Sequence, residues 1–277
     1  MNVYIVLRCI TLTPFNTLSP IMIMNLRFFK YQCAGNDFIL LDARESGINL
    51  SKEQIRLICD RNFGIGADGL MYLEPPRHEG DHFYMVYFNA DGSESSMCGN
   101  GGLCISKFAT DQGLVTVRLQ FHAIDGPHWA EVRGESVALG MIDVPGVVES
   151  HGAFFVDTGS PHHVVVADTH QDDFIAFARP LRDAYGEDGC NINSLVALEH
   201  GFSIRTFERG VENETLACGT GAVAAAMVAV HNGLANVPVH LKALGGELIV
   251  SFEGSGPFTS VVLEGPAQYS FEGYWKG

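Results

Sequence analysis

Two short cysteine motifs, 120 residues apart, constrain the fold of this 277-residue chain more than any other feature. CGNG at residues 98–101 returns as CGTG at residues 218–221, and a glycine 15 residues after each cysteine ends a stretch compatible with a helix. Two more landmarks recur at nearly the same offset: residues 88–92 correspond to 207–210, and 35–38 to 159–162. Such offsets predict two similar domains that face each other.

Short runs of β-branched and aromatic residues dominate the chain and predict strands. They lie at residues 28–31, 38–42, 83–88, 115–122, 136–142, 154–156, 163–166, 203–207, 237–241, 247–252 and 259–263. Helices are fewer: one is predicted at 51–60, where SKEQ has the pattern of a capping box, and one after each repeated cysteine. The predicted fold class is therefore α+β, with mostly antiparallel sheet.

The repeat divides the chain into an N-terminal extension at 1–24, a first domain at 25–144 together with 266–277, and a second domain at 145–265. The extension is apolar, but Pro14 and Pro20 break it too often for one membrane-spanning helix. Its only basic residue, Arg8, lies inside the apolar run, which does not fit a signal peptide. A membrane-associated leader remains the alternative for this segment.

Composition excludes several classes of partner. Seventeen basic residues against 32 acidic ones give a net charge of −15, which repels nucleic acid and anionic membrane surfaces. The chain has seven cysteines and no CxxC pair, so neither a zinc ribbon nor a thioredoxin-like motif is indicated, and we expect no metal. An odd count in a chain of this length fits reduced thiols in the cytoplasm.

Each repeated cysteine is expected just before a helix, where free N–H groups and partial positive charge gather. That environment is expected to lower the thiol pKa from its usual value of about 8.5 and to bind a substrate carboxylate. Two facing domains would then place the Cys98 and Cys218 sulfurs on opposite faces of one α-carbon. One thiolate would remove the α-proton while the other thiol protonates the opposite face, as in a two-base racemase or epimerase. A single Cys beside Gly is more often a small core residue, and the pairing of the two motifs argues against that interpretation.

At these residues the sequence resembles the diaminopimelate epimerase family from about residue 24 to its end. The motifs that carry the resemblance are GNDF at 35–38, GIGADG at 64–69, FNADGSE at 88–94, MCGNGG at 97–102, GSPH at 159–162, NIN at 191–193, ERG at 208–210 and ETLACGTG at 214–221. The resemblance implies a cofactor-independent enzyme that interconverts LL- and meso-2,6-diaminoheptanedioate for lysine and peptidoglycan synthesis. It also implies two pseudosymmetric domains, each a mostly antiparallel sheet wrapped around a central helix, with the active site in the cleft between them. It makes a homodimer plausible.

The resemblance also assigns roles to residues. It implies that Cys98 and Cys218 are the acid/base pair and that His162 and Glu208 tune their protonation. Substrate would be held by these residues: Gly99, Asn100, Gly219 and Thr220 at the reacting carboxylate, and Asn36, Asn89, Asn191, Glu208 and Arg209 at the distal end. Without the motifs, His162 is an ordinary turn histidine, Glu208 a surface carboxylate, and each Asn a turn residue that bonds its own backbone.

Several positions depart from the family pattern and bear on substrate discrimination. Ser160 stands where the family often has Asn, Leu103 where it often has Arg, and Gly69 where some members have Gln. Ser194 occupies a position where an aromatic residue is common, and Cys33 one where glycine is common.

Three other functions remain open. One is another isomerase of the same fold, such as a proline or hydroxyproline racemase or a phenazine-pathway isomerase. Proline-type substrates would leave Glu208, Arg209 and Asn191 without a distal group to bind. A thiol redox or metal-binding protein could use the same two cysteines. A non-enzymatic module could hold an amino acid in the cleft. A pyridoxal phosphate racemase is disfavoured because no lysine-centred motif stands out.

Overall fold

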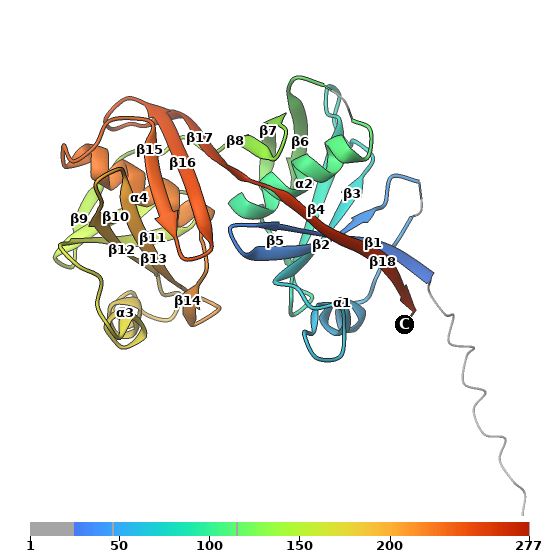
Figure 1. The fold of residues 1–277 in the computed structure, drawn as a ribbon, viewed down its shortest axis with the longest axis horizontal. Helices are drawn as coiled ribbons and strands as arrows, with labels where there is room; N and C mark the ends of the chain where they lie inside the picture. Colours follow the sequence, from blue (N-terminus) through green and yellow to red (C-terminus); the bar gives the residue numbers. More distant parts are fainter. Residues whose placement is uncertain (1–24, 46, 115, 277) are drawn as a thin grey trace, which may run out of the picture.

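The computed structural model describes residues 25–45, 47–114 and 116–276, so the predicted extension at 1–24 lies outside the described residues. The described chain forms two lobes of mostly antiparallel sheet with few helices, as the predicted α+β class requires (Figure 1). Among the described residues, every helix is too short or too polar to cross a bilayer.

The first lobe contains two helices and nine strands. They are β1 (Asn25–Cys33), β2 (Asn36–Asp42), α1 (Lys52–Cys59), β3 (Gly69–Glu74), β4 (Phe83–Asn89), β5 (Glu94–Ser95), α2 (Gly99–Asp111), β6 (Leu119–Ala123), β7 (Gly126–Arg133), β8 (Ser136–Gly140) and, from the end of the chain, β18 (Gln268–Lys276). The capping box of α1 is confirmed, because Ser51 Oγ accepts from the Gln54 N–H and Gln54 Oε1 accepts from the Ser51 N–H.

The second lobe repeats this order. Its elements are β9 (Val148–Ser150), β10 (Ala153–Asp157), β11 (Pro161–Ala167), α3 (Phe174–Asp183), β12 (Asn191–Ala197), β13 (Phe202–Glu208), β14 (Asn213–Thr215), α4 (Gly219–His231), β15 (Val239–Ala243), β16 (Gly246–Glu253) and β17 (Thr259–Pro266).

The strand pairings show that the lobes are duplicates. β2 and β3 run parallel with α1 between them, as β11 and β12 do with α3. β4 pairs antiparallel with β3 and β5 and parallel with β6, and β13 makes the same three kinds of pairing with β12, β14 and β15. The internal repeat seen in the sequence is therefore a repeat of topology.

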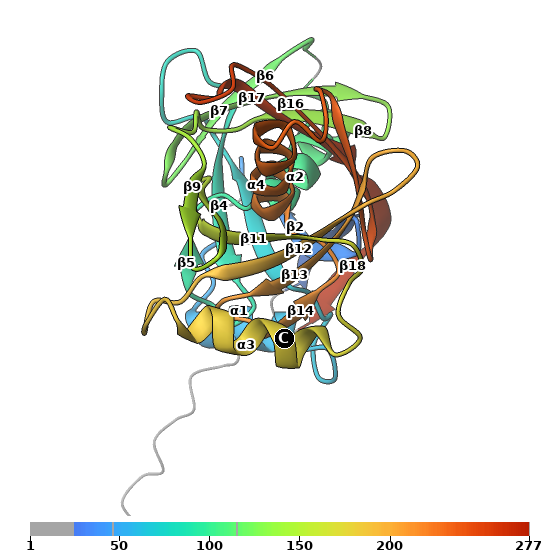
Figure 2. The same ribbon diagram turned by 90° about the vertical axis from the view of Figure 1, so that its left-hand side faces the viewer.

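One 13-residue helix lies at the centre of each lobe, α2 in the first and α4 in the second. Ten residues of each helix are buried, because the sheet of its lobe surrounds it; Figure 2 shows α4 ringed by strands, with α3 on the outside. A helix that is buried on nearly all sides must be apolar all round, and the AVAAAMVAV run of α4 meets that requirement. Both helices end as predicted: Gly113 and Gly233 follow their caps with φ of 95° and 67°.

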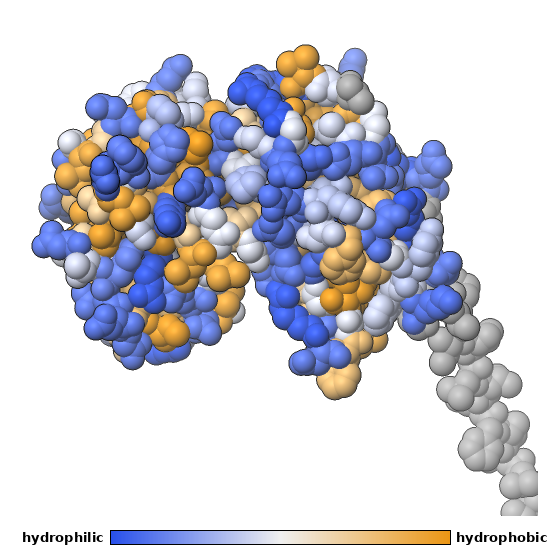
Figure 3. Space-filling model, in the orientation of Figure 1, coloured by the Kyte–Doolittle hydropathy of each residue, from blue (hydrophilic) through white to orange (hydrophobic). Residues whose placement is uncertain are grey.

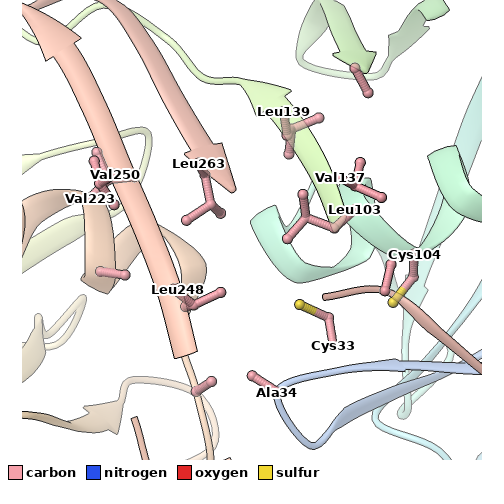
Figure 4. Close-up of a cluster of buried hydrophobic side chains, with 14 of the residues drawn as sticks. Cys33, Ala34, Leu103, Cys104, Val137, Leu139, Val223, Leu248, Val250 and Leu263 are labelled. Atoms are coloured by element: carbon pink, nitrogen blue, oxygen red, sulfur yellow. The ribbon is translucent and has the colours of Figure 1, made fainter. Parts of the chain in front are cut away.

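The two lobes share one continuous apolar core. β8 of the first lobe pairs antiparallel with β17 of the second, which joins the two sheets edge to edge. Figure 4 shows Leu248 and Leu263 of the second lobe and Leu103 and Leu139 of the first on the two sides of this junction, all fully or almost fully buried. After β17 the chain crosses back and adds β18 to β1.

All eleven predicted strands have a counterpart, although residue 115, the first of the predicted strand at 115–122, lies outside the described residues. The sequence patterns missed α3, the long strands β3, β7, β12 and β18, and the short strands β5, β9 and β14. β3 and β12 are buried on both faces and lack the alternation that marks a half-buried strand. The α3 helix contains Pro180, which is a helix breaker in sequence-based reasoning.

Candidate active site

Cys98 and Cys218 are the N-cap residues of α2 and α4, as the sequence predicts. The first residues of the two helices touch across the junction: a Cβ placed on Gly219 would lie 3.2 Å from the Cα of Gly99. The side chain of Asn100 crosses the same boundary and donates to the carbonyl of Ala217 at 3.2 Å. The N-termini of the two central helices therefore meet at one place, with one cysteine from each lobe beside it.

The expectation of lowered thiol pKa values is wrong for this structure. Burial raises the pKa of Cys98 to about 11 and raises that of Cys218 well above its usual value. Backbone N–H groups of each helix terminus act in the expected direction, but desolvation and the negative charge of Glu208 outweigh them at both sulfurs. Both cysteines are therefore thiols in this state, and ionising either one costs free energy.

A chain of hydrogen bonds leads from the sheet of the second lobe to Cys218. Asn193 Nδ2 donates to Nδ1 of the fully buried His162, so we assign the proton of the ring to Nε2. His162 Nε2 lies 3.0 Å from Thr220 Oγ1, and that hydroxyl lies 3.4 Å from Cys218 Sγ. Gly221 makes this approach possible, because a Cβ there would lie 2.6 Å from Asn193 Oδ1.

His162 is neutral in this chain. Burial, with a smaller effect from the positive charge of Arg209, lowers its pKa to about 3. A neutral Nε2–H donor leaves the Thr220 hydroxyl free to point its own hydrogen at Cys218. The arrangement therefore places a hydrogen-bond donor, not a cation, beside the sulfur.

Glu208 contacts Cys218 from the end of β13. Its carboxylate accepts from Thr215 Oγ1 at 2.5 Å and from the Cys218 thiol, while burial raises its pKa. The thiol–carboxylate contact means that Glu208 both accepts a hydrogen bond from Cys218 and opposes its ionisation.

In the first lobe, Asn36 and Asn100 form hydrogen bonds beside Cys98. Asn36 Oδ1 accepts from Asn100 Nδ2 at 3.3 Å and lies 3.8 Å from Cys98 Sγ. Asp68 fixes the orientation of the Asn36 amide by accepting from its Nδ2 at 2.6 Å. The amide oxygen therefore faces the sulfur.

Asp68 belongs to a cluster of charged residues that also contains Arg61, Asp37 and Lys30. Arg61 bridges the carboxylates of Asp37 and Asp68 at 2.6 and 2.7 Å. The almost fully buried Lys30 contacts Asp37 at 2.7 Å and donates to the carbonyl of Gly66. This cluster holds the residues that precede β3 against the start of β2, where Asn36 lies.

Of the remaining predicted residues, Asn191 and Arg209 form hydrogen bonds within the protein, and Asn89 is exposed. Asn191 is buried and donates to Ser160 Oγ at 2.9 Å, while its Oδ1 accepts the N–H of Arg209 at 3.0 Å. The Arg209 guanidinium donates to the carbonyl of Asp188. Asn89 is exposed at the end of β4, and within the described residues its side chain forms no hydrogen bond.

Several residues around the thiols were missed by sequence reasoning. Asn193 is two residues after Asn191 in β12, so strand alternation places both on one face, a signal that was available. Thr206 and Thr215, which bond Asn193 and Glu208, lie on neighbouring strands and had no such signal. In the part of the chain that the structure describes, no cluster of His, Cys, Asp and Glu is arranged to hold a metal ion.

The sequence model of one family, described as diaminopimelate epimerase, matches residues 28–143 and 154–270, one stretch in each lobe. The chain belongs to the diaminopimelate epimerase family. The diaminopimelate epimerase of Flavobacterium psychrophilum is 42% identical over 258 residues, covering 89% of this chain and 99% of that protein. The one from Chlorobaculum tepidum is 42% identical over 254 residues, covering 87% and 97%.

Solved structures with much lower identity share the two-lobed fold. A phenazine biosynthesis protein of the PhzF family from Bacillus anthracis has a TM-score of 0.69 at 14% identity, covering 91% of this chain and 99% of that one. A hydroxyproline epimerase from Agrobacterium vitis, solved with bound trans-4-hydroxy-L-proline, has a TM-score of 0.67 at 11% identity, covering 90% of each chain. These likenesses establish the α+β fold of two lobes, each built around a central helix.

The structure places the residues at which this chain departs from the family pattern. Leu103 and Cys33 are fully buried at the junction, where a Cβ on Gly265 would meet both side chains. Ser160 holds Asn191, and Ser194 accepts or donates a hydrogen bond with His170 Nδ1 at 2.9 Å. Gly69 lies beneath the ring of Tyr87.

Proposed function

We propose that this member of the family interconverts LL- and meso-2,6-diaminoheptanedioate through Cys98 and Cys218, without a cofactor. The observation that carries the proposal is the meeting of two helix N-termini at Gly99 and Gly219, each with a cysteine as its N-cap. Unbonded N–H groups at such termini suit the carboxylate next to the reacting carbon. In the space-filling view the surface is notched between the two lobes (Figure 3).

The proposed chemistry conserves protons on the enzyme. The thiolate of one cysteine takes the α-proton and becomes a thiol, leaving a carbanion whose charge spreads into the adjacent carboxylate. The opposite thiol then protonates the other face of the carbon and becomes a thiolate. Hydrogen bonds from Gly99, Asn100, Gly219 and Thr220 to the carboxylate would stabilise the carbanion, and their benefit is largest where water is excluded.

His162 and Glu208 are proposed to tune the sulfur on the second-lobe side. The Thr220 hydroxyl, oriented by His162, can donate to a thiolate at Cys218 and lower the cost of forming it. Glu208 acts oppositely while it is charged, so the pair allows the cysteine to alternate between thiol and thiolate. Binding of substrate, with its two ammonium groups, would offset the negative charge of Glu208.

The distal end of a diamino dicarboxylate needs both an anion-binding and a cation-binding group. Arg209 suits the distal carboxylate, while Glu208, Asn36, Asn89 and Asn191 offer oxygens to the distal ammonium. Proline-type substrates lack such an end, so these residues favour diaminoheptanedioate over a hydroxyproline or proline racemase substrate. A binding module or a redox protein would need neither the paired helix termini nor the His162–Thr220 chain.

We also propose a cytoplasmic location and a homodimer. The described cysteines are free thiols, which persist where the compartment is reducing. β18 pairs with β1 on one side, leaves its other edge unpaired within the described residues, and exposes Tyr269, Phe271 and Tyr274. An edge strand with exposed aromatic residues fits pairing with a second copy. Light scattering should give twice the chain mass for the wild type and the chain mass for Phe271→Glu.

The test of the proposed function is α-proton exchange in heavy water. Purified protein and meso-2,6-diaminoheptanedioate should incorporate one deuterium at the reacting carbon and form the LL isomer. Cys98→Ala and Cys218→Ala should each reduce epimerisation at least 10³-fold while still binding substrate by calorimetry. Normal epimerisation by either variant, or no exchange by the wild type with this substrate, would contradict the proposal.

A further inference from the structure

Gly69 and Tyr87 form an unusual pair on the wall of the candidate site. In the parallel pairing of β2 and β3, Gly69 lies opposite Phe38; in the duplicated pairing of β11 and β12, Asn191 lies opposite His162. Gly69 is therefore the first-lobe equivalent of Asn191. The second lobe has the amide side chain of Asn191 at this position, and the first lobe has a glycine without a side chain.

The ring of Tyr87 occupies the space over this glycine. A Cβ on Gly69 would lie 2.6 Å from Cε2 and 3.1 Å from the hydroxyl oxygen of Tyr87. The ring also packs edge-on against Phe38, with centroids 6.1 Å apart. The hydroxyl of Tyr87 therefore lies where the side chain of residue 69 would begin, so the first lobe does present a polar group there, from the neighbouring strand.

The surroundings of this hydroxyl belong to the site. Burial raises the pKa of Tyr87, and interactions with Cys98, Asp68 and Glu208 add to this effect, so the phenol is neutral. Within the described residues the Tyr87 hydroxyl has no hydrogen-bond partner. It is not one of the fully buried polar atoms that lack a partner, so a ligand can reach it. A hydroxyl that is reachable, unpaired and close enough to Asp68 and Glu208 to interact with their charges is well suited to accept a hydrogen bond from a cation.

We propose that the Tyr87 hydroxyl binds the distal ammonium group of the substrate, taking the place of a side chain at residue 69. The proposal rests on the function proposed above. Gly69 serves the same purpose, because any larger residue would collide with the ring and with the carbonyl oxygen of Phe88, 2.7 Å from the position of its Cβ. The pair would make this chain depend on a phenol for recognition of the non-reacting end.

The experiment compares Tyr87→Phe with the wild type in the epimerisation assay. Loss of one hydrogen bond to a charged group should raise KM about tenfold and change kcat less than threefold, because the reacting end is untouched. The matched control is Tyr84→Phe, from the opposite face of the same strand, where the ring lies under the Arg77 guanidinium. This control should leave both constants within twofold of wild type.

A ligand without the distal ammonium separates a binding role from a structural one. 2-Aminoheptanedioate keeps both carboxylates, and its inhibition constant should be the same for the wild type and Tyr87→Phe. An unchanged KM in Tyr87→Phe, or an equal weakening of both ligands, overturns the role of Tyr87 while leaving the two-cysteine function intact. Absence of exchange in the wild type would overturn the proposed function, and the role of Tyr87 with it.

Discussion

Gly219 approaches Gly99 so closely that a Cβ on Gly219 would lie 3.2 Å from the Cα of Gly99 and 2.9 Å from Cδ2 of the fully buried Leu263. The two glycines begin the helices that carry the cysteines at their N-caps. Their contact sets the separation of the two helix termini, so the distance between the sulfurs depends on the absence of two side chains.

The Gly219→Ala variant should therefore remain folded and lose catalysis. A methyl group there must push α4 away from α2 by a few tenths of an ångström or displace Leu263. Small displacements of acid/base groups have large effects on rate, so we expect kcat to fall about 10²-fold. The measurement is epimerisation together with thermal unfolding. Gly146→Ala is the matched control, because nothing lies within 4 Å of its Cβ position; equal kcat values for the two variants would contradict the prediction.

Replacing Glu208 with Gln should make Cys218 easier to ionise. Burial is the larger cause of the raised pKa of Cys218, and the Glu208 carboxylate is the next. Removing that charge should lower the midpoint of the pH dependence of Cys218 alkylation by about one unit. Mass spectrometry can follow iodoacetamide labelling of this cysteine separately from the others.

The matched control for the alkylation experiment is Glu253→Gln, which removes an exposed carboxylate at the end of β16. It should leave the midpoint where it is in the wild type. A midpoint that stays at the wild-type value or moves upward in Glu208→Gln would contradict the proposed effect of the Glu208 carboxylate on Cys218.

The parts of the site that follow from local chemistry could be predicted from the sequence. A cysteine before a helix-compatible stretch that ends in glycine fixes the N-cap, and the constant offset between Cys98 and Cys218 predicts the duplicated lobes. His162 and Glu208 were predicted through the family motifs, and the structure places both near Cys218, one through Thr220 and one directly.

The parts that depend on burial could not be predicted. The thiol pKa values were expected to fall because helix N-termini favour anions, but the extent of desolvation is decided by how the two lobes pack. The pairing of β8 with β17 joins segments more than 100 residues apart, and no local pattern encodes it. The Gly69–Tyr87 contact likewise needs the register of β3 and β4 to become visible.

Lys30→Met should destabilise the protein more than the loss of an exposed ion pair. Lys30 is almost fully buried. It forms an ion pair with Asp37 and donates a hydrogen bond to the carbonyl of Gly66, and both groups would lose this partner. Breaking a buried ion pair from one side typically costs about 3–5 kcal/mol, and Arg61 remains to compensate part of it, so we expect about 2–4 kcal/mol. Urea unfolding measures it. Arg133→Met, which removes an exposed partner of Glu131, should cost less than about 1 kcal/mol.

His162 should make the protein less stable in mild acid. Its pKa is lowered from 6.5 to about 3, mainly by burial, so below pH 6.5 the unfolded chain binds a proton here that the folded chain does not. The free energy of unfolding therefore falls as pH decreases from about 6.5 towards 3, with a slope of up to about 1.4 kcal/mol per pH unit from this group. His162→Gln cannot titrate, so between pH 6 and pH 4 its stability should fall less steeply by up to that amount, whatever its absolute stability. Urea titrations at several pH values give the slope. An unchanged slope in His162→Gln would show that the His162 ring takes up its proton in the folded protein as readily as in the unfolded chain.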